Sequence, residues 1–182
     1  MNARVLAVLL NLAALPLTFL TASCARSSDQ ALPRMICGTQ IDPDLTRALV
    51  SSRHDLHEFS RVDRSSAVSA PCVLLSGRDP VINLHFWWAD GPADLREMAE
   101  GAGTVSRVTD ARKIAFRYEA VVGTDGAIAA SRCMSKTGDH FALTLQLPQI
   151  KLTDQSHRKD IEKFMRAYFP ATLRTLGCGG SR

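Results

Sequence analysis

The clearest pattern of hydrophobic and polar residues lies in segment 81–89, VINLHFWWA. Its even positions carry only large apolar side chains: Ile82, Leu84, Phe86 and Trp88. Its odd positions are mixed and include His85 and Trp87. A period of two with aromatic and β-branched residues is typical of a strand that buries one face. We therefore expect a strand here, with His85 and Trp87 on the side opposite the core.

Four further segments have strand character: 72–76, 112–122, 127–135 and 139–149. The turn signals GRDP at 77–80, TDG at 124–126 and KTGD at 136–139 separate neighbouring segments. Residues 51–71 are polar and rich in serine, so they predict a loop.

The segment 154–176 shows the strongest helical pattern, because its apolar residues recur at intervals of three and four. Asp154 or Ser156 can cap its start, and Gly177 can end it. Pro170 lacks an amide hydrogen, which predicts a kink or two abutting helices. Shorter helices are expected at 42–50, which begins with Asp42 and Pro43, and at 90–103.

This order of elements predicts an α+β fold. We expect an antiparallel sheet of about five strands, paired through sequential hairpins without crossovers, with the helices packed on one face. The apolar stripe of the long C-terminal helix should cover the even positions of segment 81–89, because both surfaces must be buried.

The N-terminus has the features of a secretory signal peptide covering residues 1–23. Arg4 precedes an apolar run at 5–20, which is interrupted by Asn11 and Pro16 and is followed by small residues. The run is shorter than the ~20 apolar residues of a comfortable membrane span. An uncleaved anchor helix is the alternative.

Cys24 follows the apolar run directly, and the sequence TASC at 21–24 resembles the lipobox of bacterial lipoproteins. The resemblance implies lipidation of Cys24 and cleavage before it, with residues 24–36 as lipidated cysteine and tether. Thr21 stands where the lipobox usually has leucine. Ordinary cleavage, for example after Ala25, is therefore the alternative, and it would give a secreted protein.

The remaining cysteines, Cys37, Cys72, Cys133 and Cys178, form an even set, which in an exported chain predicts two disulfides. Three pairings are possible. We favour the nested one, Cys72–Cys133 with Cys37–Cys178, because Cys72 and Cys133 both lie in strand segments. The outer cysteines, Cys37 and Cys178, mark the ends of a single extracytoplasmic domain at 37–178, which is followed by a tail at 179–182.

The lipobox-like start, the four further cysteines, CGTQIDPDLTRAL at 37–49 and HRKDIEKFMRAYFPATLRTLGC at 157–178 resemble small uncharacterised lipoproteins of actinobacteria. The resemblance covers most of the mature chain. It implies an extracytoplasmic location at the cell membrane and brings no activity with it.

Composition and motifs exclude several function classes. The net charge is +4, but basic and acidic residues are interspersed, so no nucleic-acid-binding surface is expected. There is no nucleophile elbow, phosphate loop or metal-binding C-x-x-C spacing, and we predict no cofactor or metal. His54, His57 and Glu58 lack the H-E-x-x-H pattern and are expected to be solvated loop residues.

His85 and Trp87 are the candidate ligand-binding residues, because tryptophan offers a stacking surface and histidine a polar group. A face simply covered by another element is the alternative. The sequence thus favours a lipid-anchored binding or accessory module of the cell envelope, with a protein or envelope component as its partner. A cell-envelope hydrolase with an unrecognised active site is the other hypothesis.

Overall fold

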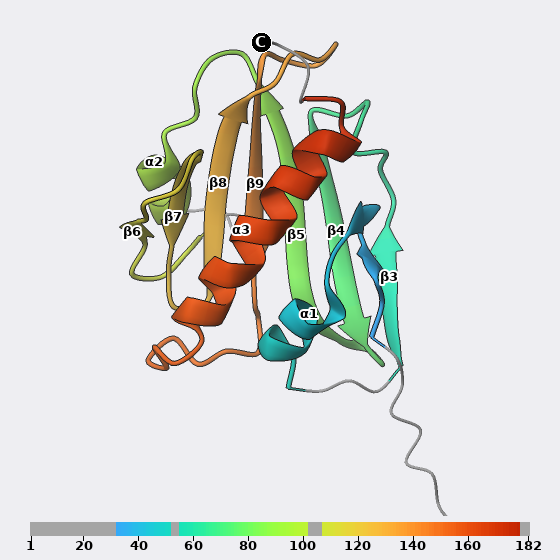
Figure 1. The fold of residues 1–182 in the computed structure, drawn as a ribbon, viewed down its shortest axis with the longest axis vertical. Coiled ribbons are helices and arrows are strands. Elements are labelled where there is room, and N and C mark those ends of the chain that lie inside the picture. Colours follow the sequence, from blue (N-terminus) through green and yellow to red (C-terminus); the bar gives the residue numbers. More distant parts are fainter. Residues whose placement is uncertain (1–31, 52–54, 102–106, 179–182) are drawn as a thin grey trace, which may run out of the picture.

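The computed structural model describes residues 32–51, 55–101 and 107–178. Figure 1 shows their arrangement, a sheet crossed diagonally by a long helix. The elements are, in chain order, β1 (Met35–Ile36), β2 (Thr39–Gln40), α1 (Pro43–Leu49), β3 (Leu56–Ser60), β4 (Ser69–Ser76), β5 (Asp79–Ala89), α2 (Leu95–Glu100), β6 (Arg112–Lys113), β7 (Glu119–Val122), β8 (Gly126–Arg132), β9 (His140–Gln146) and α3 (Arg158–Thr175).

The predicted α+β class is confirmed, but the main sheet has seven strands rather than five. Its order is β3-β4-β5-β9-β8-β7-β6, and every neighbouring pair is antiparallel. The two additional strands come from two differences. The expected loop 51–71 contains β3, and the expected strand 112–122 is divided into β6 and β7.

The prediction that sequential hairpins alone account for the strand pairing was wrong. After β5 the chain crosses to the far edge, forms β6, and returns strand by strand until β9 pairs with β5. The two central strands are therefore separated by about fifty residues of sequence, and their pairing depends on the whole second half of the sheet.

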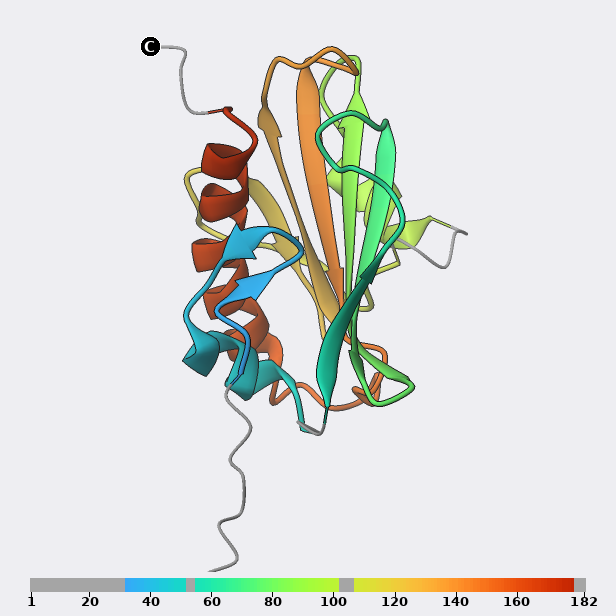
Figure 2. The ribbon, with the colours of Figure 1, turned by 90° about the vertical axis from the view of Figure 1, so that its right-hand side faces the viewer.

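The inner face of the sheet, which carries Ile82, Leu84, Phe86 and Trp88 on β5, is fully buried. The helices α1 and α3 and the hairpin β1–β2 all lie on this side (Figure 2). On α3 the buried residues are Ile161, Phe164, Met165, Tyr168, Phe169, Pro170, Thr172 and Leu173. All of these except Pro170 and Thr172 belong to the same core cluster as the inner face of β5, as the sequence predicts.

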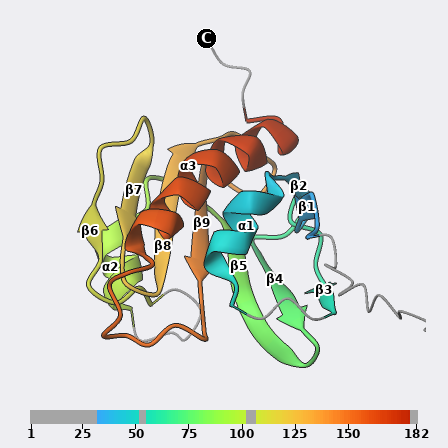
Figure 3. The same cartoon turned by 60° about the horizontal axis from the view of Figure 1, so that its bottom comes forward.

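The C-terminal helix α3 continues through Pro170, so the two abutting helices are not found. Its side chains also fix the neighbouring elements. The Tyr168 hydroxyl donates to the Ile36 carbonyl at 2.8 Å, and the hydroxyls of Thr39 and Thr172 lie 3.0 Å apart. Gly177, with φ of +76°, ends the helix as expected. Figure 3 shows α1 lying beside α3.

The expectation that all helices cover one face was wrong for α2. This short helix packs on the outer face of the sheet, opposite α3 (Figure 2). Leu95 and Ala99 of α2 form a second, smaller core with Ile128 and Ala130 of β8 and Ala142 of β9. The reason is the strand alternation: on β8 and β9 the outward positions are also apolar, so they require a cover of their own.

The four cysteines form two disulfides as predicted, but the nested connectivity was wrong: the bonds are Cys37–Cys72 and Cys133–Cys178. Cys72 lies on β4 and Cys133 directly follows β8, and β5 and β9 stand between these strands. Three strand spacings of about 4.8 Å make about 14 Å, beyond the ~7 Å Cα separation that a disulfide spans. Each observed bond instead joins the inner layer to the sheet.

Candidate functional site

The outer face of β5 presents the aromatic residue that the alternation predicts. Trp87 is 39% exposed, whereas its neighbour Trp88 on the inner face is 2% exposed. Across the sheet Trp87 pairs with Ala142 of β9, and Ala142 pairs with Ala130 of β8. A large indole beside two alanines leaves space above the sheet, and α2 stands at the side of this space.

A partly enclosed cavity of about 450 Å³ occupies that space. Its apolar lining comes from β5, β9, α2 and the turn before α2: Trp87, Ala89, Ala93, Met98, Phe141 and Ala142. Its polar lining consists of three side chains: Asp94, Glu97 and His140. The volume and the mainly apolar lining are typical of sites for small molecules.

The turn between β8 and β9 positions His140 at the edge of this cavity. Gly138 is required there, because a Cβ atom at this position would lie 2.5 Å from the carbonyl oxygen of Ala89. The close approach allows the Asp139 amide to donate to the Ala89 carbonyl at 3.1 Å. His140, the next residue, then pairs with Ala89 across the strands.

Asp139 orients the imidazole of His140. Its Oδ1 accepts from the Gly91 amide at 2.7 Å and lies 2.8 Å from His140 Nδ1. The Gly91 amide, followed by His140, lowers the pKa of Asp139 below its usual value. An ionised Asp139 can only accept, so Nδ1 of His140 carries the hydrogen between them, and Nε2 is an acceptor whenever the ring is neutral.

The helix α2 supplies the two carboxylates. Asp94 is its N-cap, and Oδ1 accepts from the amides of Arg96 and Glu97 at 2.9 and 3.1 Å. Glu97 lies three residues later, on the same side of the helix. Arg96 and Glu100 form an ion pair with each other at 3.6 Å, and they line a different hollow, on the β7 side of α2.

His85, the other predicted ligand-binding residue, lies beside the cavity but does not line it. Its ring centroid is 6.1 Å from that of Trp87. Its Nε2 lies 2.6 Å from the Ser69 hydroxyl, while its buried Nδ1 has no hydrogen-bond partner in the part of the chain that the structure describes. Burial lowers the pKa of His85, which favours the neutral ring.

The residues that line the cavity together with Trp87 were not identified from the sequence. His140 follows a turn signal and Asp94 and Glu97 belong to a helical segment, and neither pattern indicates a site. The exposed tryptophan on β5 is the one signal that points to this face. It could not identify its neighbours, because they come from β9 and α2, and neither the β5–β9 pairing nor the side on which α2 packs is evident from local patterns.

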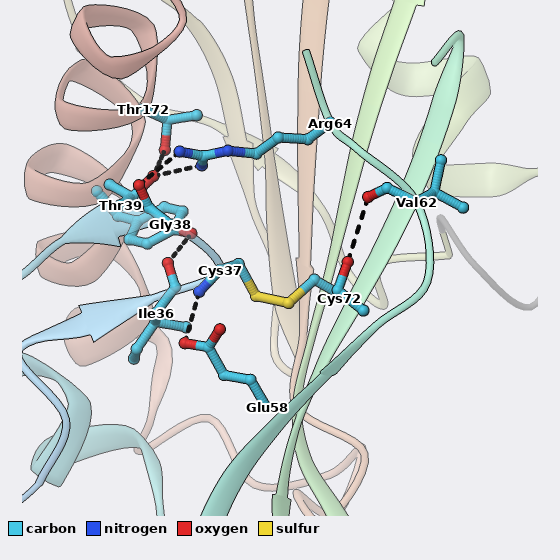
Figure 4. Close-up of a disulfide and its surroundings, with 11 residues drawn as sticks. Ile36, Cys37, Gly38, Thr39, Glu58, Val62, Arg64, Cys72 and Thr172 are labelled. Atoms are coloured by element: carbon cyan, nitrogen blue, oxygen red, sulfur yellow. Dashed lines mark hydrogen bonds between the residues drawn. A yellow bond between two sulfur atoms is a disulfide. The ribbon is translucent and has the colours of Figure 1, made fainter. Parts of the chain in front are cut away.

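A second polar cluster surrounds the disulfide Cys37–Cys72 on the inner side of the sheet (Figure 4). Glu58 Oε1 accepts from the Cys37 amide at 2.8 Å. Arg64 donates to the Thr39 hydroxyl at 2.6 Å and to the Gly38 carbonyl at 2.5 Å. These contacts hold the β1–β2 hairpin against β3 and β4, so the cluster has a structural role.

The side chains of Cys37, Cys72 and Glu58 are close enough to share a metal ion, since their ligand atoms lie within 4.8 Å of one another. The sulfur atoms of Cys37 and Cys72 are bonded to each other, however, whereas a cysteine that binds a metal must be a thiolate. His57 is the neighbour of Glu58 on β3, and alternation sends the two side chains to opposite faces, while His54 lies outside the described residues.

The N-terminal predictions also lie outside the described residues, which begin at Leu32. Leu32 and Ile36 are both buried, so packed structure already begins within the segment expected as a tether. Within the described ranges, no helix is both long enough and apolar enough to cross a membrane.

Comparison with known proteins gives no relative for this chain. No protein-family model, no curated protein and no solved structure matches it. An assignment of function therefore depends on the geometry and chemistry of the residues themselves.

Proposed function

We propose that the mature chain is an extracytoplasmic binding module, held at the membrane by a lipid on Cys24, and that it binds a small, mainly apolar molecule. The cavity beside Trp87 is the observation that carries the proposal. An indole exposed at the mouth of an apolar cavity provides contact area at a low entropic cost, since it has only two rotatable bonds.

The disulfides support the location. Two disulfide bonds are typical of proteins in oxidising environments outside the cytoplasm. They also use all four of the other cysteines, so Cys24 has no intramolecular partner among them. A single cysteine directly after a signal-like apolar run is the arrangement that lipidation requires.

Tryptophan fluorescence tests the binding. The chain has two tryptophans, and only Trp87 lines the cavity. Titration of the purified chain with 1-decanol should shift the emission to the blue and raise the melting temperature, since a ligand of the folded state stabilises it. Ala89→Leu should fill the cavity and abolish both effects, whereas Ala115→Leu, at an exposed position away from the cavity, should preserve them.

The anchor is tested separately, by expression in a bacterial host. The wild-type chain should fractionate with membranes and carry a lipid on Cys24. Cys24→Ala should be released or remain unprocessed. An unmodified mature N-terminus beyond Cys24, detected by mass spectrometry, would contradict the anchor and leave the cavity's role intact.

A further inference from the structure

All three polar side chains that line the cavity beside Trp87 are hydrogen-bond acceptors. Asp94 and Glu97 are carboxylates, and the neutral ring of His140 offers Nε2, because its Nδ1 hydrogen is directed to Asp139. No lysine or arginine stands among the described lining residues. A ligand that brings only acceptors cannot hydrogen-bond to these groups, whereas a ligand that brings donors can.

The negative charge of Glu97 is not neutralised by its neighbours on α2. Within the described part of the chain, the ion pairs include neither Asp94 nor Glu97. Arg96, the nearest cation in sequence, is directed to Glu100. An anionic group placed in the cavity would therefore meet two like charges and no compensating cation from the lining.

Trp87 also favours a cation over an anion. The face of an indole ring carries negative electrostatic potential and attracts cations that approach within about 6 Å of its centre. The apolar remainder of the lining, from Ala89, Ala93, Met98 and Ala142, offers nothing to a charged group and suits a hydrocarbon chain.

We infer that the ligand of this cavity is a cationic amphiphile, a molecule with a hydrocarbon body and a primary ammonium head that donates to Glu97 and His140. This inference rests on the proposed binding function and names its ligand class. An ammonium group fits better than a quaternary amine, because it has hydrogens to donate to these two acceptors.

Three probes that share one hydrocarbon chain test the inference: decylammonium, 1-decanol and decanoate. Each is titrated below its micellar concentration into the full chain, with Trp87 fluorescence as the readout. Decylammonium should bind at least about tenfold more tightly than 1-decanol, as expected for one charge-assisted hydrogen bond. Decanoate should bind most weakly.

Glu97→Gln should abolish the advantage of decylammonium over 1-decanol, because the neutral amide no longer forms a charge-assisted hydrogen bond with the ammonium group. Glu100→Gln is the matched control, since this residue belongs to the same helix, carries the same charge and lines the hollow on the other side. It should preserve the preference, and circular dichroism should show both variants to be folded.

The outcomes separate the two proposals. If 1-decanol and decylammonium bind equally, or decanoate binds best, the cationic class is wrong and the cavity remains a binding site. If none of the three probes binds, the proposed function itself is wrong. If Glu100→Gln removes the preference as fully as Glu97→Gln does, the effect is one of overall charge, and the assignment to Glu97 is overturned.

Discussion

The inner and outer faces of the sheet bury their side chains to very different degrees. On β5, the inner residues Ile82, Leu84, Phe86 and Trp88 are at most 2% exposed. Two residues on the outer face, His85 and Trp87, are only partly covered. The inner face is covered by two helices and a hairpin and is joined to them by both disulfides. The outer face carries the six-residue helix α2, which covers β7 and β8.

Because of this difference, the inner face contributes most of the stability and the outer face is suited to binding. The inner layer buries most of the large side chains, so the hydrophobic contribution to stability comes mainly from it. Half of the buried residues in the smaller core under α2 are alanines, and this core leaves a cavity unfilled. A surface that contributes little to stability can vary in chemistry without loss of the fold, which suits it for binding.

The largest expected effect of a substitution lies at the centre of the inner layer. Phe164 is fully buried and stacks on Tyr168 with ring centroids 5.0 Å apart. Phe164→Ala should lower the free energy of unfolding by about 3 to 5 kcal/mol, through lost burial and a new cavity. Trp87→Ala removes a larger side chain from the outer face and should cost about 1 kcal/mol or less. Equal losses in the free energy of unfolding for the two variants, measured by urea denaturation, would contradict this difference between the faces.

Loss of the disulfide Cys133–Cys178 should have the second largest effect on stability. It ties the end of α3 to the strand β8 across a separation of 45 residues. In the chain-entropy model such a loop contributes about 4 kcal/mol, so replacing both cysteines with alanine should lower stability by up to that amount. Thermal unfolding of the variant measures the loss. Non-reducing peptide mapping of the wild type should recover the two sequential pairs, and recovery of Cys72–Cys133 would refute them.

The N-cap of α2 should have a smaller effect. Asp94→Ala leaves two amides without their acceptor and should cost about 1 kcal/mol. Because α2 covers only the small outer core, hydrogen exchange should accelerate in α2 and its contacts and stay slow in α3. Uniform acceleration in both helices would mean that the two faces unfold together.

The smallest expected effect concerns pH. Burial lowers the pKa of His85 in the folded state, so between that value and the ordinary ~6.5 the unfolded chain binds more protons. The stability that neutral His85 contributes should therefore be present above about pH 6.5 and lost as pH falls towards the folded pKa. The free energies of unfolding of wild type and His85→Asn, measured by urea denaturation, should converge as pH falls over this range. A difference that is independent of pH would exclude the linkage.

Two long periodic segments could be predicted well from the sequence. The alternation of 81–89 and the helical stripe ending near Leu176 depend on many residues in agreement, and both elements bury the predicted side chains. The strand β3 was missed because Leu56–Ser60 forms an exposed sheet edge, where apolar alternation is not needed. Its place in the sheet comes from pairing with β4, which a local pattern does not reveal.

The candidate site shows the same limit. Alternation indicates that Trp87 faces away from the core, and the structure confirms it. His140 reaches the same cavity because β9 pairs with β5 from 50 residues further along the chain, and Glu97 reaches it because α2 packs on the outer face. Such non-local arrangements decide sites in antiparallel sheets, and a single sequence contains no direct record of them.

The order of the disulfides along the chain has a consequence for oxidative folding. Any process that delivers the chain with its N-terminus first exposes Cys37 and Cys72 well before Cys133 emerges. The first bond can therefore form between consecutive cysteines while the rest of the polypeptide is still in transit, and the second needs only the pair that follows. Each bond then joins cysteines that follow one another among these four, so the connectivity matches the order in which they emerge.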